Sequence, residues 1–272
     1  MDVWKQLWFN IYLFVIFATL TDSCPLSCKC LPSCYCTGTS VDCRDKRISV
    51  VTSNFPKDTC TLELSINAIK VISNTSFIGI EKIQSLNIDF NGINLIENGA
   101  FDRLTGLRKL SLKVNMITII DDKLFRGLYS LETLNLESNW ISSINRNAFS
   151  DLISLVGLNL RGNKITVFTR EMFVHNWSLS YLFIDKNPLH CNCTLDDFLN
   201  FTYGRKILID DETVCRTPSQ LTGVRLRNFN IPSCHPKLKG FTECEHSKDV
   251  FYSDKAYVTK WNNYLCLYNS AL

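Results

Sequence analysis

Hydrophobic and polar positions recur with a period of 24 residues along the middle of the chain. The clearest polar marker is an asparagine that returns at Asn67, Asn91, Asn115, Asn139, Asn163 and Asn187. A phenylalanine keeps the same period at Phe77, Phe101, Phe125, Phe149 and Phe173. Between the asparagines the pattern L-x-x-L-x-L-x-x-N-x-L recurs, and a fixed period of roughly 20 to 50 residues is typical of solenoids. The sequence therefore predicts a stack of about six similar coils.

The residue types explain why each coil needs its neighbours. The L-x-L step predicts a short parallel strand whose leucines face inward, and the asparagine side chain can pair backbone groups of the adjoining turn. The phenylalanine is expected on the returning side of the coil, where it fills the space behind the sheet. One coil cannot bury its apolar face alone, whereas a stack can. The predicted fold class is α/β, mostly β: a curved solenoid with a parallel sheet on its concave side.

The first residues and the overall charge narrow the cellular context. Residues 1–23 carry Lys5 and an apolar run from Leu7 to Leu20 that only Asn10 interrupts, which is typical of a secretory signal peptide. An uncleaved anchor is the competing interpretation, but the run is shorter than the roughly 20 residues of a spanning helix. No second segment approaches that length. We expect a secreted chain without a membrane span, and the small net charge of +3 indicates no nucleic-acid partner.

Thirteen cysteines gather mainly at the two ends of the repeats, where an open stack exposes its core. In front, the spacing is Cys30-x3-Cys34-x-Cys36-x6-Cys43; behind, Cys191-x-Cys193 is followed by Cys215 and Cys234. Cysteine pairs can also hold zinc, but the leader peptide favours disulfides. The predicted organisation is a cap at 24–58, repeats at 59–190, a second cap at 191–234 and a tail of unknown role at 235–272.

At these cysteines the chain resembles the extracellular leucine-rich repeat proteins with paired cysteine caps, which include Slit, the Nogo receptor, Toll-like receptor ectodomains and variable lymphocyte receptors. The resemblance covers about residues 30–234. It implies first-to-third and second-to-fourth pairing within each cap. The implied disulfides are Cys30–Cys36, Cys34–Cys43, Cys191–Cys215 and Cys193–Cys234.

Five cysteines remain: Cys24, Cys28, Cys60, Cys244 and Cys266. The run Cys24-x3-Cys28-x-Cys30 has the spacing of a front cap in a shifted register, so the front assignments have an alternative. We expect Cys244 to pair with Cys266 within the tail. Because the total is odd, a disulfide-linked homodimer is one hypothesis, and a buried free thiol is the other.

Surface modification is expected, whereas catalysis is not. The sequons at Asn74, Asn176 and Asn200 are predicted glycosylation sites, while Asn192 stands between two cysteines and is the weakest. The sequence holds no catalytic or phosphate-binding signature, so we expect no enzyme, no cofactor and no metal site.

Strand alternation predicts which side chains face the concave surface. One column alternates in charge, and two others end in aromatic rings at Tyr181 and Phe183, beside Gly157. The charged column has two interpretations: lateral pairs that steady the sheet, or a stripe that orients a protein ligand. The rings are a predicted binding hot spot, unless they pack against the rear cap or tail. The candidate ligand-binding residues are Asp89, Lys113, Asn135, Glu137, Asn159, Arg161, Tyr181, Phe183 and Asp185.

The resemblance implies recognition in immunity, guidance or adhesion, with a protein, or alternatively a glycan, on the concave face. A rival hypothesis is a structural matrix protein that resembles the small leucine-rich proteoglycans, which share the front cysteine spacing. Such a protein would act through disulfide-linked self-association.

Overall fold

A computed structural model describes residues 24–25, 27–33, 36–52, 54–229 and 234, and the backbone of 244–245, 258–261 and 264–267. The chain divides into two compact units, Met1–Phe229 and Asn230–Leu272. The predicted signal peptide and Cys34 lie outside the described residues. Among the residues described, no helix is long and apolar enough to cross a membrane.

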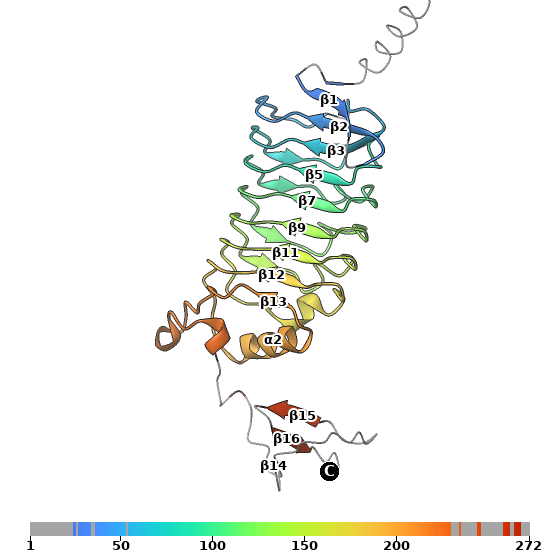
Figure 1. Cartoon of the computed structure of the whole chain (residues 1–272). Coiled ribbons are helices and arrows are strands. Elements are labelled where there is room, and N and C mark those ends of the chain that lie inside the picture. The colour runs from blue at the N-terminus through green and yellow to red at the C-terminus, as the bar shows by residue number, and fades with distance from the viewer. Residues whose placement is uncertain are drawn as a thin grey trace, which may run out of the picture. The chain divides into compact units, whose positions relative to one another are not determined.

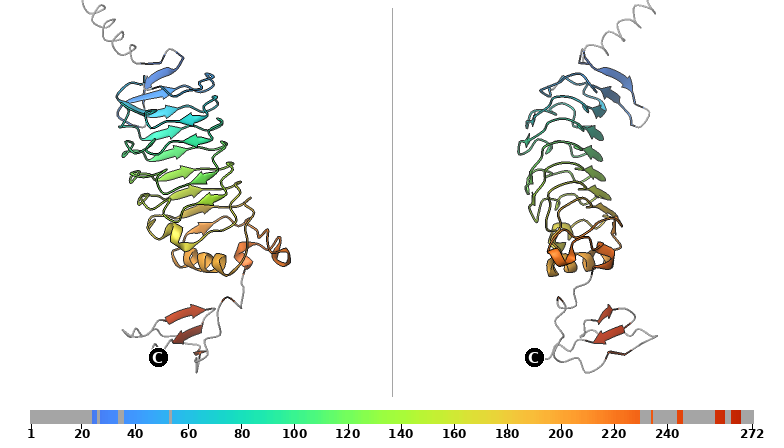
Figure 2. Two further views of the ribbon diagram at one scale, coloured as in Figure 1. Left: turned by 180° about the vertical axis from the view of Figure 1, so that it is seen from behind. Right: turned by 90° about the vertical axis from the view of Figure 1, so that its left-hand side faces the viewer.

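The first unit is a solenoid built on one sheet of nine strands in the order β1-β2-β3-β5-β7-β9-β11-β12-β13 (Figure 1). Only β1 runs antiparallel to its neighbour, β2. Figure 2 shows that the stack bends toward this sheet, which lines the concave side. The strands are β1 (Lys29–Pro32), β2 (Thr39–Asp42), β3 (Thr59–Glu63), β5 (Ser85–Asn87), β7 (Lys109–Ser111), β9 (Thr133–Asn135), β11 (Gly157–Asn159), β12 (Tyr181–Phe183) and β13 (Leu208–Ile209).

The register of the sheet follows the sequence period. From β3 to β12 each strand residue lies opposite the residue 24 positions later, so that Leu62 faces Leu86 and Leu158 faces Leu182. These central leucines are buried, while their neighbours on each strand point outward. The predicted mostly-β solenoid with a parallel concave sheet is therefore confirmed.

The repeated asparagines form a ladder that joins each coil to the one before it. The Nδ2 amide of Asn139 donates to the carbonyl oxygens of Leu112 and Leu136 at 2.9 and 3.0 Å. Its Oδ1 accepts the amide of Ile117 at 3.1 Å. Asn91, Asn115, Asn163 and Asn187 repeat this arrangement. The predicted role of the asparagine is confirmed, because its side chain pairs backbone groups that would otherwise be buried unbonded.

The phenylalanines form a continuous buried stack behind the sheet. Neighbouring rings from Phe77 to Phe173 have centroids 5.7 to 6.4 Å apart and are nearly parallel. The short helix η1 (Arg170–Phe173) supplies Phe173, the last of the repeated rings. The ring centroid of Phe198, in helix α2 (Cys193–Gly204), lies 5.8 Å from that of Phe173. Helix α2 thus covers the open end of the core, which is what a cap must do in a solenoid.

The side of the solenoid opposite the main sheet carries two short parallel pairs, β4 (Val71–Ile72) with β6 (Leu95–Ile96) and β8 (Ile119–Ile120) with β10 (Ser143–Ile144). Within the described solenoid no backbone hydrogen bond joins β6 to β8. A hollow of about 270 Å³ lies at this break, and Leu124 lines it. The position of Leu124 is held by Ser76, Ala100 and Ala148 in other coils and by Met172 in the last one. Among the described residues, β10 likewise makes no such backbone bond to the coil that carries Met172.

The front cap corrects two predicted disulfides. The observed pairs are Cys24–Cys30, Cys28–Cys43 and Cys36–Cys60, so the predicted Cys30–Cys36 and Cys34–Cys43 pairs are wrong. The physical reason is the β1–β2 hairpin. It sets Cys30 opposite Val41 in the ladder and leaves Cys36 in the connecting turn, from which it reaches Cys60 on β3. The shifted register, with Cys24 as the first cysteine, is the one that the chain adopts.

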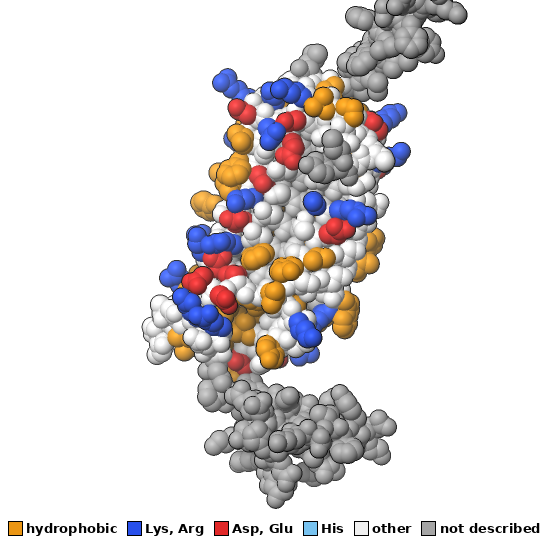
Figure 3. Space-filling model, viewed as in Figure 1, with side chains coloured by type: hydrophobic (Ala, Val, Ile, Leu, Met, Phe, Trp, Pro, Cys, Tyr) orange, Lys and Arg blue, Asp and Glu red, His pale blue; other side chains and the backbone are white. Residues whose placement is uncertain are grey.

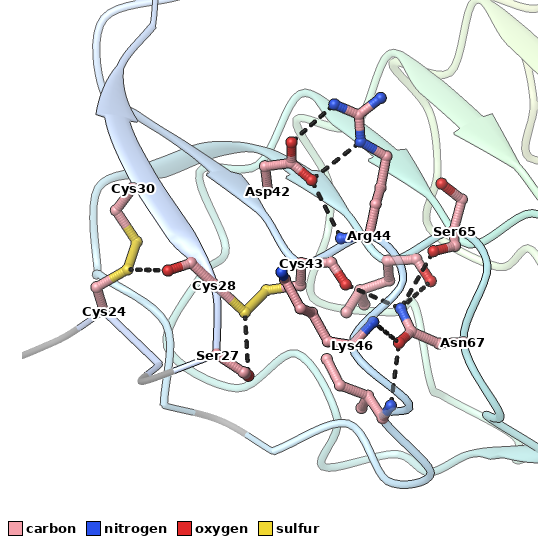
Figure 4. The surroundings of a disulfide bond; sticks show 12 residues. Cys24, Ser27, Cys28, Cys30, Asp42, Cys43, Arg44, Lys46, Ser65 and Asn67 are labelled. Atoms are coloured by element: carbon pink, nitrogen blue, oxygen red, sulfur yellow. Dashed lines mark hydrogen bonds and ion pairs between the residues drawn. A yellow bond between two sulfur atoms is a disulfide. The ribbon is translucent and has the colours of Figure 1, made fainter.

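The front cap is also bonded into the asparagine ladder. Figure 4 shows the Cys28–Cys43 disulfide beside Asn67, whose Nδ2 donates to the Cys43 carbonyl at 2.9 Å. Next to it, Arg44 donates two hydrogen bonds to the Asp42 carboxylate, at 2.7 and 3.0 Å. This contact lowers the pKa of Asp42 to about 2. Covalent and polar contacts therefore continue from the cap into the first repeat.

At the other end, Cys191 is joined to Cys215, the pair that the resemblance implied. Cys193 and Cys234 are each disulfide-bonded as well. The rear cap continues through the short helices η2 (Ser219–Leu221) and η3 (Leu226–Asn228). Disulfides thus close the solenoid at both ends.

The second unit contains a three-stranded antiparallel sheet of β14 (Cys244–Glu245), β16 (Tyr264–Leu267) and β15 (Val258–Trp261). The backbone of Cys244 lies opposite that of Cys266. The predicted disulfide between them falls on side chains outside the described residues and stays a prediction.

Candidate recognition surface

The concave sheet presents two different surfaces along its length. Figure 3 looks onto this face and shows hydrophobic side chains gathered over β11, β12 and β13, while charged and other polar side chains occupy the strands nearer the front cap. The nine candidate residues of the sequence analysis lie on or beside five consecutive strands, from β5 to β12. The structure therefore brings them onto one face, as the strand alternation requires.

The charged column pairs with itself. Lys113 Nζ lies 3.0 Å from Glu137 Oε2, and Arg161 Nε lies 2.9 Å from Asp185 Oδ1. Asn159 Nδ2 adds a hydrogen bond to Glu137 at 3.2 Å. The structure thus favours the first interpretation of the alternating signs, in which neighbouring strands neutralise each other laterally.

Asp89 begins this column and is held in place by its neighbours on β7. Its Oδ1 accepts the Ser111 hydroxyl at 2.6 Å and the Lys113 backbone amide at 2.7 Å. Burial raises the pKa of Asp89, while these hydrogen bonds oppose that rise. Asp89 therefore belongs to the hydrogen-bond network of the sheet, and its Oδ1 already accepts two hydrogen bonds.

Asp185 is the most buried charge of the column. It is 5% exposed, and burial raises the pKa of its carboxyl, with the nearby Asp210 carboxylate acting in the same direction. Arg161 is at ion-pair distance but lacks hydrogen-bond alignment, so Oδ1 of Asp185 has no hydrogen-bond donor among the residues that the structure describes. Asp185 therefore depends on Arg161 and offers little surface to a ligand, so its burial argues against the predicted contact.

The aromatic pair, in contrast, is open to solvent. Tyr181 is 48% exposed and Phe183 is 43% exposed, both on β12. Leu208 of β13 lies directly opposite Tyr181 in the sheet and is 60% exposed. On the other side, Tyr181 lies opposite Gly157, which has no side chain to cover it. We call Tyr181, Phe183 and Leu208 the apolar patch.

Leu208 is the member of the apolar patch that the repeat pattern does not reveal. This residue follows Tyr181 by 27 positions rather than 24, because helix α2 intervenes, so the repeat period does not extend to it. The available signal was the Lys-Ile-Leu-Ile-Asp segment after the helix, whose apolar residues between two charged ones are typical of a short strand.

The three predicted glycosylation sites differ in accessibility. Asn74 and Asn200 are exposed. Asn176 is 1% exposed, and its Nδ2 donates to the carbonyl oxygens of Phe149 and Leu152 at 2.8 and 2.9 Å. The acceptor nitrogen of Asn176 is thus used inside the core, which argues against the predicted glycan at this site. Asn176 occupies a buried position in the last coil and bonds the coil before it.

Comparison with known proteins agrees with this architecture. The family model described as leucine rich repeat matches residues 81–141 and 129–189. Among solved structures, the chain is similar to TLR13 in the crystal structure of a TLR13–ssRNA13 complex, with 34% sequence identity and a TM-score of 0.55. That similarity covers 60% of this chain and 23% of the TLR13 chain. The chain thus spans less than a quarter of that protein's length.

Periodic leucine coils, an asparagine ladder and disulfides at both ends define a class of capped solenoids. The chain contains leucine-rich repeats and has the architecture of a leucine-rich repeat protein with disulfide-bonded cysteines at both ends. Repeats of this kind form recognition surfaces for other molecules.

Proposed function

We propose that the chain is a secreted, non-enzymatic recognition protein that binds a protein ligand through the apolar patch of its concave face. Secretion is supported by the leader-like residues 1–23 and by the number of disulfides, which form in oxidising compartments. The proposal concerns this chain alone, because TLR13 is far longer.

One observation carries the proposal: the apolar patch is exposed on a face whose charges are paired with each other. Tyr181, Phe183 and Leu208 lie side by side on two neighbouring strands. Aromatic side chains at the centre of an interface supply much of the binding free energy, and surrounding polar pairs fix the orientation. Arg161 and Asn159 border the patch and are the polar contacts that we expect beside it.

A nucleic-acid ligand is the second hypothesis, because the similar TLR13 structure is a complex with ssRNA13. Binding to phosphates requires lysine and arginine side chains that can leave their partners. On this concave sheet Lys113 and Arg161 are paired with carboxylates, which disfavours that ligand. If single-stranded RNA binds, its affinity should fall steeply between about 50 and 200 mM salt. The absence of a nucleic-acid partner remains a prediction.

A matrix structural role is the third hypothesis, and it predicts covalent self-association. Intact mass with and without reduction separates it from the recognition role, because a reducible dimer or ladder would favour assembly. A monomer would favour a recognition module.

The direct test is a binding screen of the secreted chain against an array of purified extracellular and cell-surface protein domains. For any ligand found, Tyr181→Ala and Phe183→Ala should each weaken binding by about 1 to 3 kcal/mol, or roughly 5- to 150-fold. Trp140→Ala is the matched control, because Trp140 is an exposed aromatic residue outside the patch. Unchanged binding in both patch variants, with normal secretion, would reject the patch as the site.

A further inference from the structure

A second hollow lies on the concave face near the front cap, on strands that the apolar patch does not reach. Its volume is about 550 Å³, within the range of roughly 300 to 1,000 Å³ that is usual for small-ligand sites. Strands β2, β3, β5 and β7 form its floor. The lining residues are Cys36, Ser40, Thr61, Glu63, Gln84, Ser85, Arg108, Lys109 and Glu132.

Two pairs of this hollow are engaged with each other: Arg108 Nη1 lies 3.1 Å from Glu132 Oε1, and Thr61 donates to Ser40. In the part of the chain that the structure describes, no side-chain hydrogen bond or ion pair involves Gln84, Ser85 or Lys109. The carboxylate of Glu63 is half-buried and forms no ion pair among the described residues; burial raises its pKa, while the charge of Arg44 opposes that rise. The charged column toward the rear is paired, so the front hollow is where polar groups are available to a ligand.

One wall of the hollow is covalently fixed. Cys36, which lines it, is bonded to Cys60 of β3, and Thr61 donates to the Ser40 hydroxyl at 2.6 Å. The third disulfide of the front cap therefore holds the β1–β2 turn against the edge of the hollow. A site that is rigid before binding loses less conformational entropy when its ligand arrives.

The chemistry of the lining selects the ligand. Two carboxylates, Glu63 and Glu132, balance two cations, Arg108 and Lys109, so the hollow has no net charge to attract an ion. Among its described lining residues, none is aliphatic or aromatic, so a peptide side chain would find no apolar anchor. Hydroxyl, amide, carboxylate and ammonium groups together offer both donors and acceptors. Such a mixture suits a ligand rich in hydroxyl groups.

We propose that this hollow is a binding site for a neutral carbohydrate, with Glu63, Gln84, Ser85 and Lys109 as its hydrogen-bonding residues. Glu63 accepts from sugar hydroxyls, Lys109 donates, and Gln84 and Ser85 do both. The site is distinct from the apolar patch, because β7, its nearest strand, is three strands from β12, or about 14 Å at 4.8 Å per strand. The proposal does not depend on the protein-binding role of that patch.

The test applies the secreted full chain to an array of neutral, sialylated and sulfated oligosaccharides, followed by titration of the best neutral binder. A neutral oligosaccharide should bind. Glu63→Gln should weaken it by about 12- to 150-fold and Ser85→Ala by about 2- to 12-fold, the ranges for hydrogen bonds to charged and to neutral groups. Ser85→Ala removes one hydroxyl and serves if Glu63→Gln is not secreted. The control Glu171→Gln changes an exposed glutamate elsewhere and should leave binding unchanged.

Three outcomes would overturn the proposal. In the first, no neutral oligosaccharide binds; in the second, Glu63→Gln and Ser85→Ala bind it with the same affinity as the unmodified chain. In the third, only sulfated and sialylated oligosaccharides bind, and salt abolishes that binding. Tyr181→Ala separates this site from the apolar patch. It should leave carbohydrate binding intact while it weakens the protein ligand, so that either proposal can fail without the other.

Discussion

Replacement of Asn139 by leucine tests whether the asparagine ladder holds the coils together. Leucine has the same branching pattern, is larger, and can neither donate nor accept a hydrogen bond. In Asn139→Leu the buried amide of Ile117 loses its partner. The carbonyls of Leu112 and Leu136 each lose one of two hydrogen bonds, because Asn115 and Asn163 still donate to them.

The expected loss is large compared with the stability of a typical domain. The orphaned Ile117 amide costs about 1 to 3 kcal/mol, and each carbonyl loses one hydrogen bond worth about 0.5 to 1.5 kcal/mol, so the total is about 2 to 6 kcal/mol. Natural domains are stable by about 5 to 15 kcal/mol in total. Asn139→Leu should therefore be secreted poorly and should unfold at a much lower urea concentration.

Urea unfolding followed by circular dichroism measures the change. Asn147→Leu is the matched control in the same coil, because Asn147 is exposed and its side chain forms no hydrogen bond with any described residue. This control should lie within about 0.5 kcal/mol of the unmodified chain. If Asn139→Leu unfolds as the control does, the backbone groups find other partners and the ladder is not what couples the coils.

Three further predictions concern modification, charge and disulfides. Intact mass should show that Asn74→Gln lacks a glycan that the unmodified chain carries, whereas Asn176→Gln should carry the same glycans as the unmodified chain. If Asn176→Gln also lacks a glycan, this coil is open when the chain is glycosylated. Arg161→Met should cost about 1 to 2 kcal/mol at pH 7, because Asp185 loses its cation. The pKa of the Asp185 carboxyl is already raised, so the loss of stability in Arg161→Met should shrink as pH falls and this carboxyl is protonated. An equal loss of stability at pH 7 and at pH 4 would contradict this. If Cys244 pairs with Cys266, the number of cysteines leaves Cys34 without a partner. Any disulfide-linked dimer should then disappear in Cys34→Ser; a dimer that persists in this variant would show that another cysteine links the two chains.

The repeat core could be predicted from the sequence because the physical requirement repeats. Each coil must bury a leucine such as Leu134 and bond its turn through an asparagine such as Asn139, so one register explains every repeat. The side chains that point out of the concave face could be predicted because side chains alternate across a strand. The sequence also placed Tyr181 and Phe183 on the concave face, and the structure shows them exposed there.

The caps could not be predicted as well, because their contacts are made once. The spacing of three and one residues occurs twice in front, starting at Cys24 and at Cys30, and only the β1–β2 hairpin decides between them. A sequon likewise specifies three residues and not their burial, so the buried position of Asn176 could not be predicted from it. Leu208 could not be predicted from the repeat, because the 24-residue period ends before it.

The interrupted ladder between β6 and β8 divides the solenoid energetically. In a one-dimensional stack the stability of the whole depends on the coupling between adjacent coils. The coils that meet at β6 and β8 share the concave sheet and the stacked rings, but lack the second set of backbone bonds that join β4 to β6 and β8 to β10. Within the described residues, β10 makes no such bonds to the coil that follows it either. Under mechanical tension or denaturant these two junctions are the weaker ones, so the chain should separate there first. The second junction lies between the front hollow and the apolar patch, so these two surfaces would then lie in different blocks, each with its own stability.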